Sequence, residues 1–295
     1  MGNKVLILCN TNVFPSRLFE QRGVDFHQYF NAEISFAAKI LRRLTLSVGF
    51  FRRNFWYGKW FYQLGTYDTI LLFAINDIKD VIKDVEKFTK SGQRKIIYFW
   101  DPVFRISECL EYPFEKWSFD VQDCSKYNLI YNSTFYFKQI VSDVQSAVKL
   151  DYNSVYFIGL DKGRRKLISE IQETLKLMDI HTHFIVFDDN VKERITFEEN
   201  LKNISASNAI LDLSQQNQSG LTVRVMESIF LAKKLITNNS LIREQAFYHP
   251  DNIFIIGNDV MSDLKTFLLK PYNKKHVESF QDYFDFDNWM RRFEV

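Results

Sequence analysis

The sequence predicts an α/β protein with two doubly wound domains that face a cleft. Short apolar runs rich in β-branched and aromatic residues alternate with amphipathic helical patterns along most of the chain. The connections between these runs are short, which is typical of parallel sheets whose strands are joined by crossover helices. The chain is 295 residues long, which exceeds the usual size of one domain and favours two.

The first domain is expected to occupy residues 1–150. Its opening apolar run at residues 5–9 passes into the polar residues 10–12, as a first parallel strand passes into a loop. Most of the aromatic stretch at residues 104–135 is expected to be irregular. Further along the domain, the patterns predict strands at residues 69–75, 95–100 and near 129–131, and helices at residues 34–44, 78–90 and 136–150.

The second domain is expected at residues 151–272, after a polar break at residues 151–154. Strands and helices alternate throughout it, which again predicts a doubly wound sheet. The tail at residues 273–295 is expected to end in a helix that packs back on the first domain. The expected strands are residues 155–158, 183–187, 209–213, 234–237 and 253–256, and the expected helices are residues 165–178, 196–205, 222–232 and 260–269.

Composition and cysteine usage favour a soluble protein of a reducing compartment. Hydrophobic residues make up 46% and charged residues 25%, with a net charge of +2. Cys9, Cys109 and Cys124 share no CxxC or metal-ligand spacing. The N-terminal apolar run suits a buried strand better than a signal peptide, and no window approaches the ~20 apolar residues of a membrane span. We expect a cytoplasmic protein, with peripheral binding to the inner face of the cell membrane left open.

One segment is strongly basic and aromatic. No Asp or Glu occurs between residues 34 and 67, whereas six Lys and Arg residues fall between residues 39 and 59, among many Phe and Trp. In one interpretation, residues 39–60 bind an anionic membrane surface, with the cations at the headgroups and the rings at headgroup depth. In the other, the rings belong to the core and the cations to a solvated face. Nucleic-acid binding is a third, weaker alternative.

Sequence motifs exclude two common nucleotide chemistries and mark one candidate base. No GxGxxG follows the first strand of either domain, and GxxxxGK[ST] is absent, which argues against dinucleotide and P-loop sites. Asp101 follows the strand at residues 95–100, and functional groups of open α/β sheets gather beyond the carboxyl ends of strands. Asp101 is therefore the candidate catalytic residue, although Asp before Pro102 is also a common turn starter.

Two segments of the second domain combine glycines, cations and a helix start. The first follows the strand at residues 155–158, where glycines permit close backbone approach and cations attract an anion. The second follows residues 209–213 and opens a helix whose first amides face the same end of the sheet. An acid further along that helix suits the two hydroxyls of a ribose. The candidate ligand-binding residues are Gly159, Lys162, Arg164, Ser219, Gly220, Leu221, Thr222, Arg224 and Glu227.

These segments resemble the donor half of GT-B glycosyltransferases, in particular bacterial enzymes of capsular polysaccharide and lipopolysaccharide synthesis. The resemblance implies two Rossmann-like domains, with Lys162 and Arg164 in the basic turn that holds a donor diphosphate. It implies helix-start amides at residues 220–222 and ribose binding by Glu227. Residues 118–132 also resemble the first domain of such enzymes.

The sequence departs from the family pattern at two places. The common retaining pattern has a Glu where Ser219 stands, and the turn at residues 232–234 has no Gly. Inverting transfer with Asp101 as base is therefore an option, and stereochemistry stays open. The DxD at residues 285–287 lies in a helical context and suits a cap or surface pair, and His181 and His183 have no third ligand nearby in sequence. No metal and no cofactor are expected.

The predicted function is transfer of a sugar from a nucleotide-sugar donor to a glycan acceptor, lipid-linked and part of bacterial surface polysaccharide synthesis. No nucleic-acid partner is expected. The alternative is a non-enzymatic α/β protein that binds nucleic acid or a membrane through residues 39–60.

Overall fold

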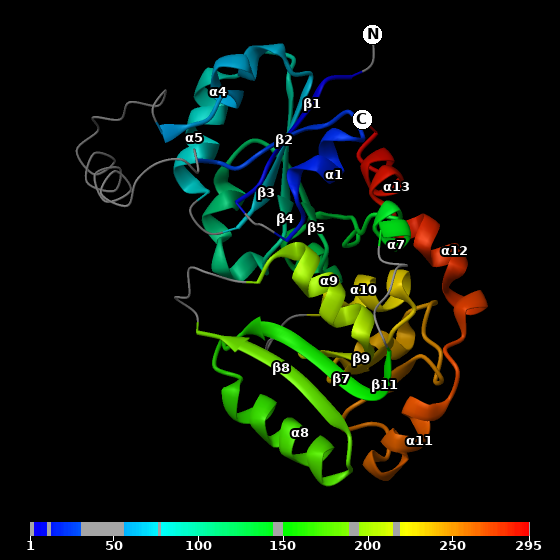
Figure 1. Cartoon of the computed structure of the whole chain (residues 1–295). Coiled ribbons are helices and arrows are strands. Elements are labelled where there is room, and N and C mark those ends of the chain that lie inside the picture. The colour runs from blue at the N-terminus through cyan, green and yellow to red at the C-terminus, as the bar shows by residue number, and fades with distance from the viewer. Residues whose placement is uncertain are drawn as a thin grey trace. The chain divides into compact units, whose positions relative to one another are not determined.

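The computed structural model describes residues 3–10, 13–30, 56–75, 78–143, 150–188, 195–214 and 219–294. The chain divides into two compact units, Met1–Asn132 together with Phe293–Val295, and Ser133–Arg292. This division falls earlier in the chain than the predicted boundary between residues 150 and 151. Figure 1 shows the elements of each unit, which are taken separately below.

The first unit contains a six-stranded parallel sheet in the order β2-β1-β3-β4-β5-β6. The chain runs from β1 to β2 on one side and then returns to β3 on the other, so the sheet reverses its winding between β1 and β3. Both of these strands are buried along their whole length, as expected for parallel strands covered on two faces. The strands are β1 (Val5–Leu8), β2 (Asp25–His27), β3 (Thr69–Ala74), β4 (Arg94–Phe99), β5 (Glu115–Ser118) and β6 (Ile130–Tyr131).

The helices of the first unit include one, α6, that is capped at both ends. The carboxylate of Asp120 accepts hydrogen bonds from the amides of Gln122 and Asp123 and so caps α6, which ends at the left-handed Asn128. The predicted strands at residues 5–9, 69–75 and 95–100 and the helix at residues 78–90 are confirmed. The helical elements are α1 (Ser16–Glu20), α4 (Trp60–Gln63), α5 (Lys79–Phe88) and α6 (Val121–Tyr127), with 3-10 turns at Leu64–Thr66, Val103–Arg105 and Ser107–Glu111.

The second unit contains a five-stranded parallel sheet in the order β11-β10-β9-β7-β8. Its winding reverses between β7 and β9, because the chain goes from β7 to β8 and then crosses back. The expected break at residues 151–154 is instead the start of β7, which carries an irregularity in its pairing with β9 there. The strands are β7 (Asp151–Leu160), β8 (His181–Phe187), β9 (Ser207–Asp212), β10 (Lys234–Thr237) and β11 (Ile253–Ile255).

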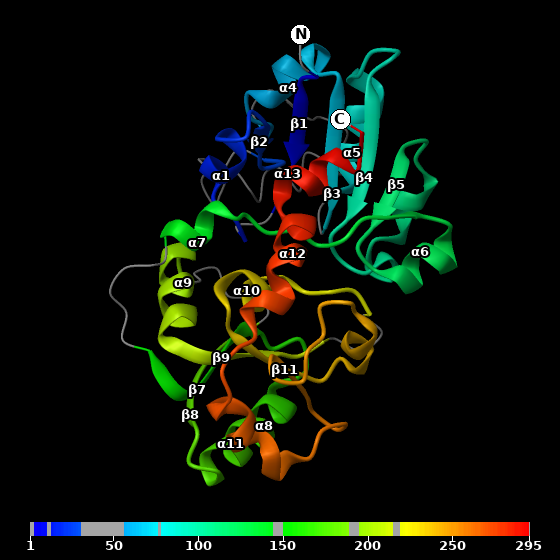
Figure 2. The same ribbon diagram turned by 90° about the vertical axis from the view of Figure 1, so that its right-hand side faces the viewer.

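Helices cover both faces of the second sheet, α8 (Arg165–Leu177) and α11 (Leu264–Leu269) on one and α9 (Phe197–Ala206) and α10 (Val223–Leu231) on the other, as Figures 1 and 2 show. Alternating strand residues supply the two cores. Val155 and Phe157 pack with Ile168 of α8, whereas Tyr156 packs with Ile204 of α9. The predicted α/β class with two doubly wound, Rossmann-like domains is thus confirmed.

The chain ends with α12 (Lys274–Phe284) and α13 (Phe286–Arg291). The tail was expected to return to the first domain, residues 1–150. Trp289 packs against Phe135 and donates its indole N–H to the carbonyl of Ser133 at 2.6 Å, and both of these residues lie within that range although they group with the second unit. The chain joins the first unit at Phe293, whose ring contacts Trp117. A short helix, α7 (Gln139–Asp143), and 3-10 turns at Ser240–Glu244 and Met261–Asp263 complete the second unit.

The basic aromatic segment at residues 39–60 lies mostly outside the described residues, which resume at residue 56. In the described part, Trp56 is 3% and Trp60 0% exposed. The indole N–H of Trp60 donates to the carbonyl of Tyr29, and the hydroxyl of Tyr57 donates to Asp84. These rings therefore belong to the core of the first unit. Among the described helices, none combines the length and apolar character that crossing a bilayer requires.

Candidate functional site

The carboxyl ends of all five strands of the second sheet meet at one edge, because the sheet is wholly parallel. Doubly wound sheets bind ligands at this edge, where the winding reverses. Here that point lies between β7 and β9. The turn at residues 161–164 follows β7, and the segment at residues 213–222 follows β9. The predicted ligand-binding residues, from Gly159 to Glu227, lie in or beside these two segments.

The turn after β7 is tight. Lys162 and Gly163 both adopt left-handed backbone conformations, with φ of 46° and 74°. The carboxylate of Asp161 accepts the backbone N–H of Arg165 at 2.7 Å and its Nε at 3.1 Å, which fixes the start of α8. A Cβ added to Gly159 would lie 3.1 Å from the ring of Phe157, so a larger residue there would require that ring to shift. The turn thus places the cation Lys162 at the edge on a strained backbone.

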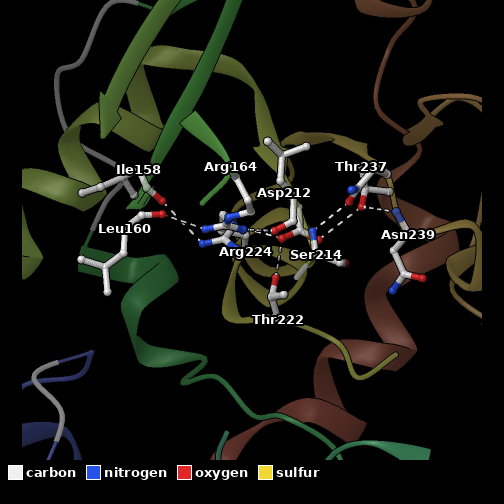
Figure 3. Close-up of polar contacts among 11 residues, drawn as sticks. Ile158, Leu160, Arg164, Asp212, Ser214, Thr222, Arg224, Thr237 and Asn239 are labelled. Atoms are coloured by element: carbon white, nitrogen blue, oxygen red, sulfur yellow. Dashed lines mark hydrogen bonds and ion pairs between the residues drawn. The ribbon is translucent and has the colours of Figure 1, made fainter. Parts of the chain in front are cut away.

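Arg164 joins the two strands at the reversal point. Its Nη1 donates to the carbonyl of Leu213, just after β9, and its Nη2 donates to the carbonyl of Leu160, at the end of β7, at 2.9 Å. Its Nε lies 3.4 Å from the carbonyl of Asp161. The guanidinium is therefore held by backbone oxygens, and it places a fixed positive charge at the reversal point (Figure 3).

A second guanidinium is held by a buried carboxylate. Asp212, the last residue of β9, is 1% exposed and accepts the Nε of Arg224 at 3.0 Å. Nη1 of Arg224 lies 3.5 Å from the carbonyl of Ile158, and the guanidinium lies 5.9 Å from the ring centre of Phe157. Its Nη2 has no hydrogen-bond partner among the residues that the structure describes. Figure 3 shows Arg164 and Arg224 converging on the same edge.

The described part of the segment before α10 resumes at Ser219 and is held next to the helix start. Gly220 and Leu221 are buried, and the carbonyl of Leu221 accepts the hydroxyl of Thr134 at 2.6 Å. Thr222 occupies the N-cap position of α10, but its side chain makes no capping hydrogen bond. Its hydroxyl donates instead to Asp212 at 2.9 Å. The first amides of α10 therefore lie at the edge without a cap from the Thr222 side chain.

Polar groups at the end of β10 complete the edge. The hydroxyl of Thr237 donates to Asp212 at 3.2 Å and accepts the backbone N–H of Asn239 at 3.1 Å. The side chain of Asn238 accepts the backbone N–H of Ser214 at 2.8 Å. Sequence reasoning did not single out Asp212, Thr237 or Asn238. The available signal was position alone, because all three lie at or just beyond the carboxyl end of a strand.

Glu227 lies on α10, one turn beyond Arg224, and is only 5% exposed. Burial raises the pKa of its carboxyl to about 7, although the nearby charge of Arg224 and a hydrogen bond from Asn200 act in the opposite direction. The amide of Asn200, on α9, donates to its Oε1 at 3.1 Å. The structure therefore places the predicted ribose acid inside the unit, close to Arg224, and ribose binding by Glu227 stays a prediction.

Asp101 belongs to the first unit, at the carboxyl edge of its sheet. It follows β4, is half-buried, and its backbone N–H lies 3.4 Å from the carbonyl of Ala74. Its carboxylate has no hydrogen-bond partner in the described part of the chain. Two other acids nearby differ, since Asp120 caps α6 and Asp123 accepts the backbone N–H of Val103 at 2.8 Å. The catalytic role of Asp101 stays a prediction.

The described residues contain no group of three or more His, Cys, Asp or Glu side chains that could hold a metal ion. His181 pairs with Asp151 at 2.6 Å, which raises the pKa of the imidazole. Asp285 of the DxD stands at the N-cap position of α13 and accepts the backbone N–H of Lys138 at 2.8 Å. These groups are thus engaged in local structure.

No protein-family model matches the sequence, and no curated protein matches it. Solved structures do match in fold. One is Anabaena Alr3699/HepE in complex with UDP and glucose, with a TM-score of 0.58 and 10% identity, over 99% of this chain and 98% of the other. Another is an alpha-glucosyltransferase in complex with UDP and a 13-mer DNA containing a central A:G mismatch, with a TM-score of 0.54 and 12% identity, over 100% and 94%. At such identities the likeness shows the fold alone, which is the two-domain GT-B fold.

Proposed function

We propose that the protein is a glycosyltransferase that moves a sugar from a nucleoside-diphosphate sugar to a glycan acceptor. One observation carries the proposal: two immobilised guanidinium groups, Arg164 and Arg224, lie at the point where the second sheet reverses its winding. Cations held in place in this position suit a diphosphate better than an uncharged ligand. UDP is the first nucleotide to test, because the structures of similar fold cited above contain it.

The chemistry breaks the bond between the sugar C1 and the oxygen of the β-phosphate, and forms a bond between C1 and an acceptor hydroxyl. The diphosphate leaves with the electron pair, so negative charge grows on it during transfer. We assign its stabilisation to Arg224, Lys162 and the first amides of α10, with Arg164 supplying charge and fixing the turn. In this proposal the cations act without a metal. The hydroxyl proton passes to a base, for which Asp101 is the candidate.

We propose a lipid-linked glycan of a bacterial surface polysaccharide as the acceptor, with the enzyme working at the inner face of the cell membrane. Support comes from the resemblance of residues 118–132 to the first domain of such enzymes and from the basic composition of residues 39–60. A DNA acceptor is the competing choice, because one structure of similar fold was solved with DNA. Product analysis with UDP-glucose and either lipid-linked oligosaccharides or duplex DNA separates these acceptors.

Isothermal titration calorimetry with UDP, GDP and CMP tests the donor proposal. The wild-type protein should bind UDP, and Arg224→Ala should weaken binding at least ~10-fold, because a charge-assisted contact to the diphosphate is lost. Lys265→Gln is the matched control. It also removes one cation from the second unit, but Lys265 contacts Asp179, which precedes β8 at the opposite edge. A wild-type protein that binds no nucleotide at millimolar concentration would contradict the proposal and favour the non-enzymatic alternative.

A further inference from the structure

We propose that Asp212 is a positioning residue, which holds the guanidinium of Arg224 in the orientation that binds the donor diphosphate. The inference rests on the proposed function and concerns how its site is built. It follows from where the carboxylate lies, from which donors converge on it, and from the sign of its charge.

Three donors from two elements converge on the buried carboxylate of Asp212. Its Oδ1 accepts the hydroxyl of Thr222 at 2.9 Å and the Nε of Arg224 at 3.0 Å, both from the start of α10. Its Oδ2 accepts the hydroxyl of Thr237, at the end of β10, at 3.2 Å. A carboxylate that is 1% exposed and bonded from both sides cannot rotate freely, so it fixes the Nε edge of the Arg224 guanidinium.

The hydroxyl of Thr222 bonds Asp212 instead of capping α10. Thr is a favoured N-cap residue because its side-chain oxygen can accept an amide of the first helical turn. Thr222 instead donates its hydroxyl to Asp212 and makes no capping hydrogen bond to α10. The carboxylate therefore anchors the helix start as well as Arg224. The first amides of α10 and the guanidinium of Arg224 therefore lie at the same edge of the sheet, just beyond the carboxyl end of β9.

The charge of Asp212 distinguishes positioning from simple attraction. A buried carboxylate 3.0 Å from the Nε of Arg224 offsets the positive charge that would attract an anion. If charge alone mattered, Asp212→Asn would tighten diphosphate binding. If orientation matters more, the same variant weakens it, because a neutral amide oxygen holds the Nε of Arg224 less firmly than a carboxylate oxygen does. The two possibilities thus predict opposite signs.

Titrations of UDP, inorganic pyrophosphate and uridine into the wild type and Asp212→Asn test the inference. We expect UDP and pyrophosphate to bind about 10-fold more weakly to the variant, the effect of losing one charge-assisted hydrogen bond, while uridine affinity is unchanged. A gain or no change in UDP and pyrophosphate affinity would overturn the inference, and so would an equal loss for uridine, which indicates general damage. If the wild type binds pyrophosphate but not UDP, the proposed function is overturned, and the pyrophosphate affinities of wild type and variant then decide the inference.

Threonine variants keep the test decisive if Asp212→Asn does not fold. Thr222→Val removes the hydroxyl that anchors Oδ1, the oxygen bonded to Arg224, and should weaken UDP binding severalfold, whereas Thr222→Ser should restore it. Thr237→Val is the comparison. It removes the donor to the other oxygen, Oδ2, and should weaken UDP binding less than Thr222→Val does, because Oδ1 keeps its bonds to Thr222 and Arg224. Equal losses of UDP affinity in Thr222→Val and Thr237→Val would overturn the inference, and wild-type protein that binds neither UDP nor pyrophosphate would overturn both proposals.

Discussion

The two sheets share one topology but differ in the side chains at their carboxyl edges. Each sheet reverses its winding beside its first strand, β1 in the first unit and β7 in the second. At the first edge the rings of Phe73 and Trp100 pack 5.3 Å apart, and Asp101 is a carboxylate without a described partner. At the second edge, arginines are fixed by backbone carbonyls and a buried acid. The two sheets thus offer equivalent positions at the point where the winding reverses, and the side chains at each position determine its chemistry.

The largest expected effect concerns the first edge. Asp101→Asn should lower the rate of sugar transfer by about 10²–10⁴-fold, the usual worth of a positioned base, and leave UDP affinity unchanged. Transfer assays with calorimetry on the same samples measure both quantities. Asp120→Ala is the comparison, since it removes the cap of α6 and should lower thermal stability instead. Retained turnover in Asp101→Asn would place the base elsewhere. Loss of UDP affinity in this variant would contradict the assignment of the base to the first edge and of donor binding to the second.

A second prediction concerns the buried acid of the second edge. Burial raises the pKa of the Glu227 carboxyl from its usual 4.5 to about 7 in the folded protein. Between these two pH values the carboxyl is protonated in the folded state and ionised in the unfolded state. Wild-type stability should therefore fall as the pH rises from about 4.5 to 7. The free energy of unfolding of Glu227→Gln, relative to that of wild type, should therefore increase by on the order of 2–3 kcal/mol between pH 5 and pH 8.

Urea denaturation of both proteins at the two pH values checks this difference, because any pH-independent effect of the substitution cancels. A difference that does not change with pH would show that Glu227 titrates as an exposed acid. UDP affinity of the same variant tests its predicted contact with ribose, which Gln would weaken.

A third prediction compares one glycine from each unit. Gly163, in the turn at the second edge, and Gly92, in the turn before β4, both have positive φ, and a Cβ added to either would enter open space. Replacing either by Ala should cost about 1 kcal/mol through backbone strain alone. Thermal denaturation should show similar losses for the two variants, whereas calorimetry should show weaker UDP binding only for Gly163→Ala. Equal UDP affinity in the two variants would mean that the turn containing Lys162 does not contribute to UDP binding.

The smallest expected effect is a gain. Ala232 ends α10 in the left-handed conformation, with φ of 51°, at the turn where the resembling enzymes carry a glycine. Ala232→Gly should relieve this strain and stabilise the protein by about 0.5–1 kcal/mol after the entropy cost of glycine in the unfolded chain. Chemical denaturation measures the gain, and UDP affinity should not change. Destabilisation would mean that contacts of the Ala232 methyl group outweigh the backbone strain.

Much of the fold was predictable because buried parallel strands leave apolar runs with few polar interruptions. Strand β3, which is wholly buried, was predicted within one residue. Strand β5 was missed because Glu115 and Lys116 interrupt its pattern, and Glu115 is kept in the sheet by an ion pair with Arg94 at 2.6 Å. Such a pairing between strands cannot be recognised before the strands are placed side by side.

The candidate site was predictable in part. Cations and glycines beside helix starts identified Arg164 and Arg224, because those residue types have few other reasons to gather there. Asp212 was not assigned a role because the sequence does not show which donors its carboxylate meets. Its partners, Thr222 and Thr237, lie 10 and 25 residues away and meet it only when α10 and β10 pack beside β9. Local pattern cannot reveal such a convergence.

A crystal structure of the protein soaked with UDP would show most directly whether the second edge binds the donor. We expect the diphosphate at the reversal point between β7 and β9, within hydrogen-bond distance of Arg224 and of the first amides of α10. UDP bound at the carboxyl edge of the first sheet, or bound without contact to Arg224, would contradict this assignment.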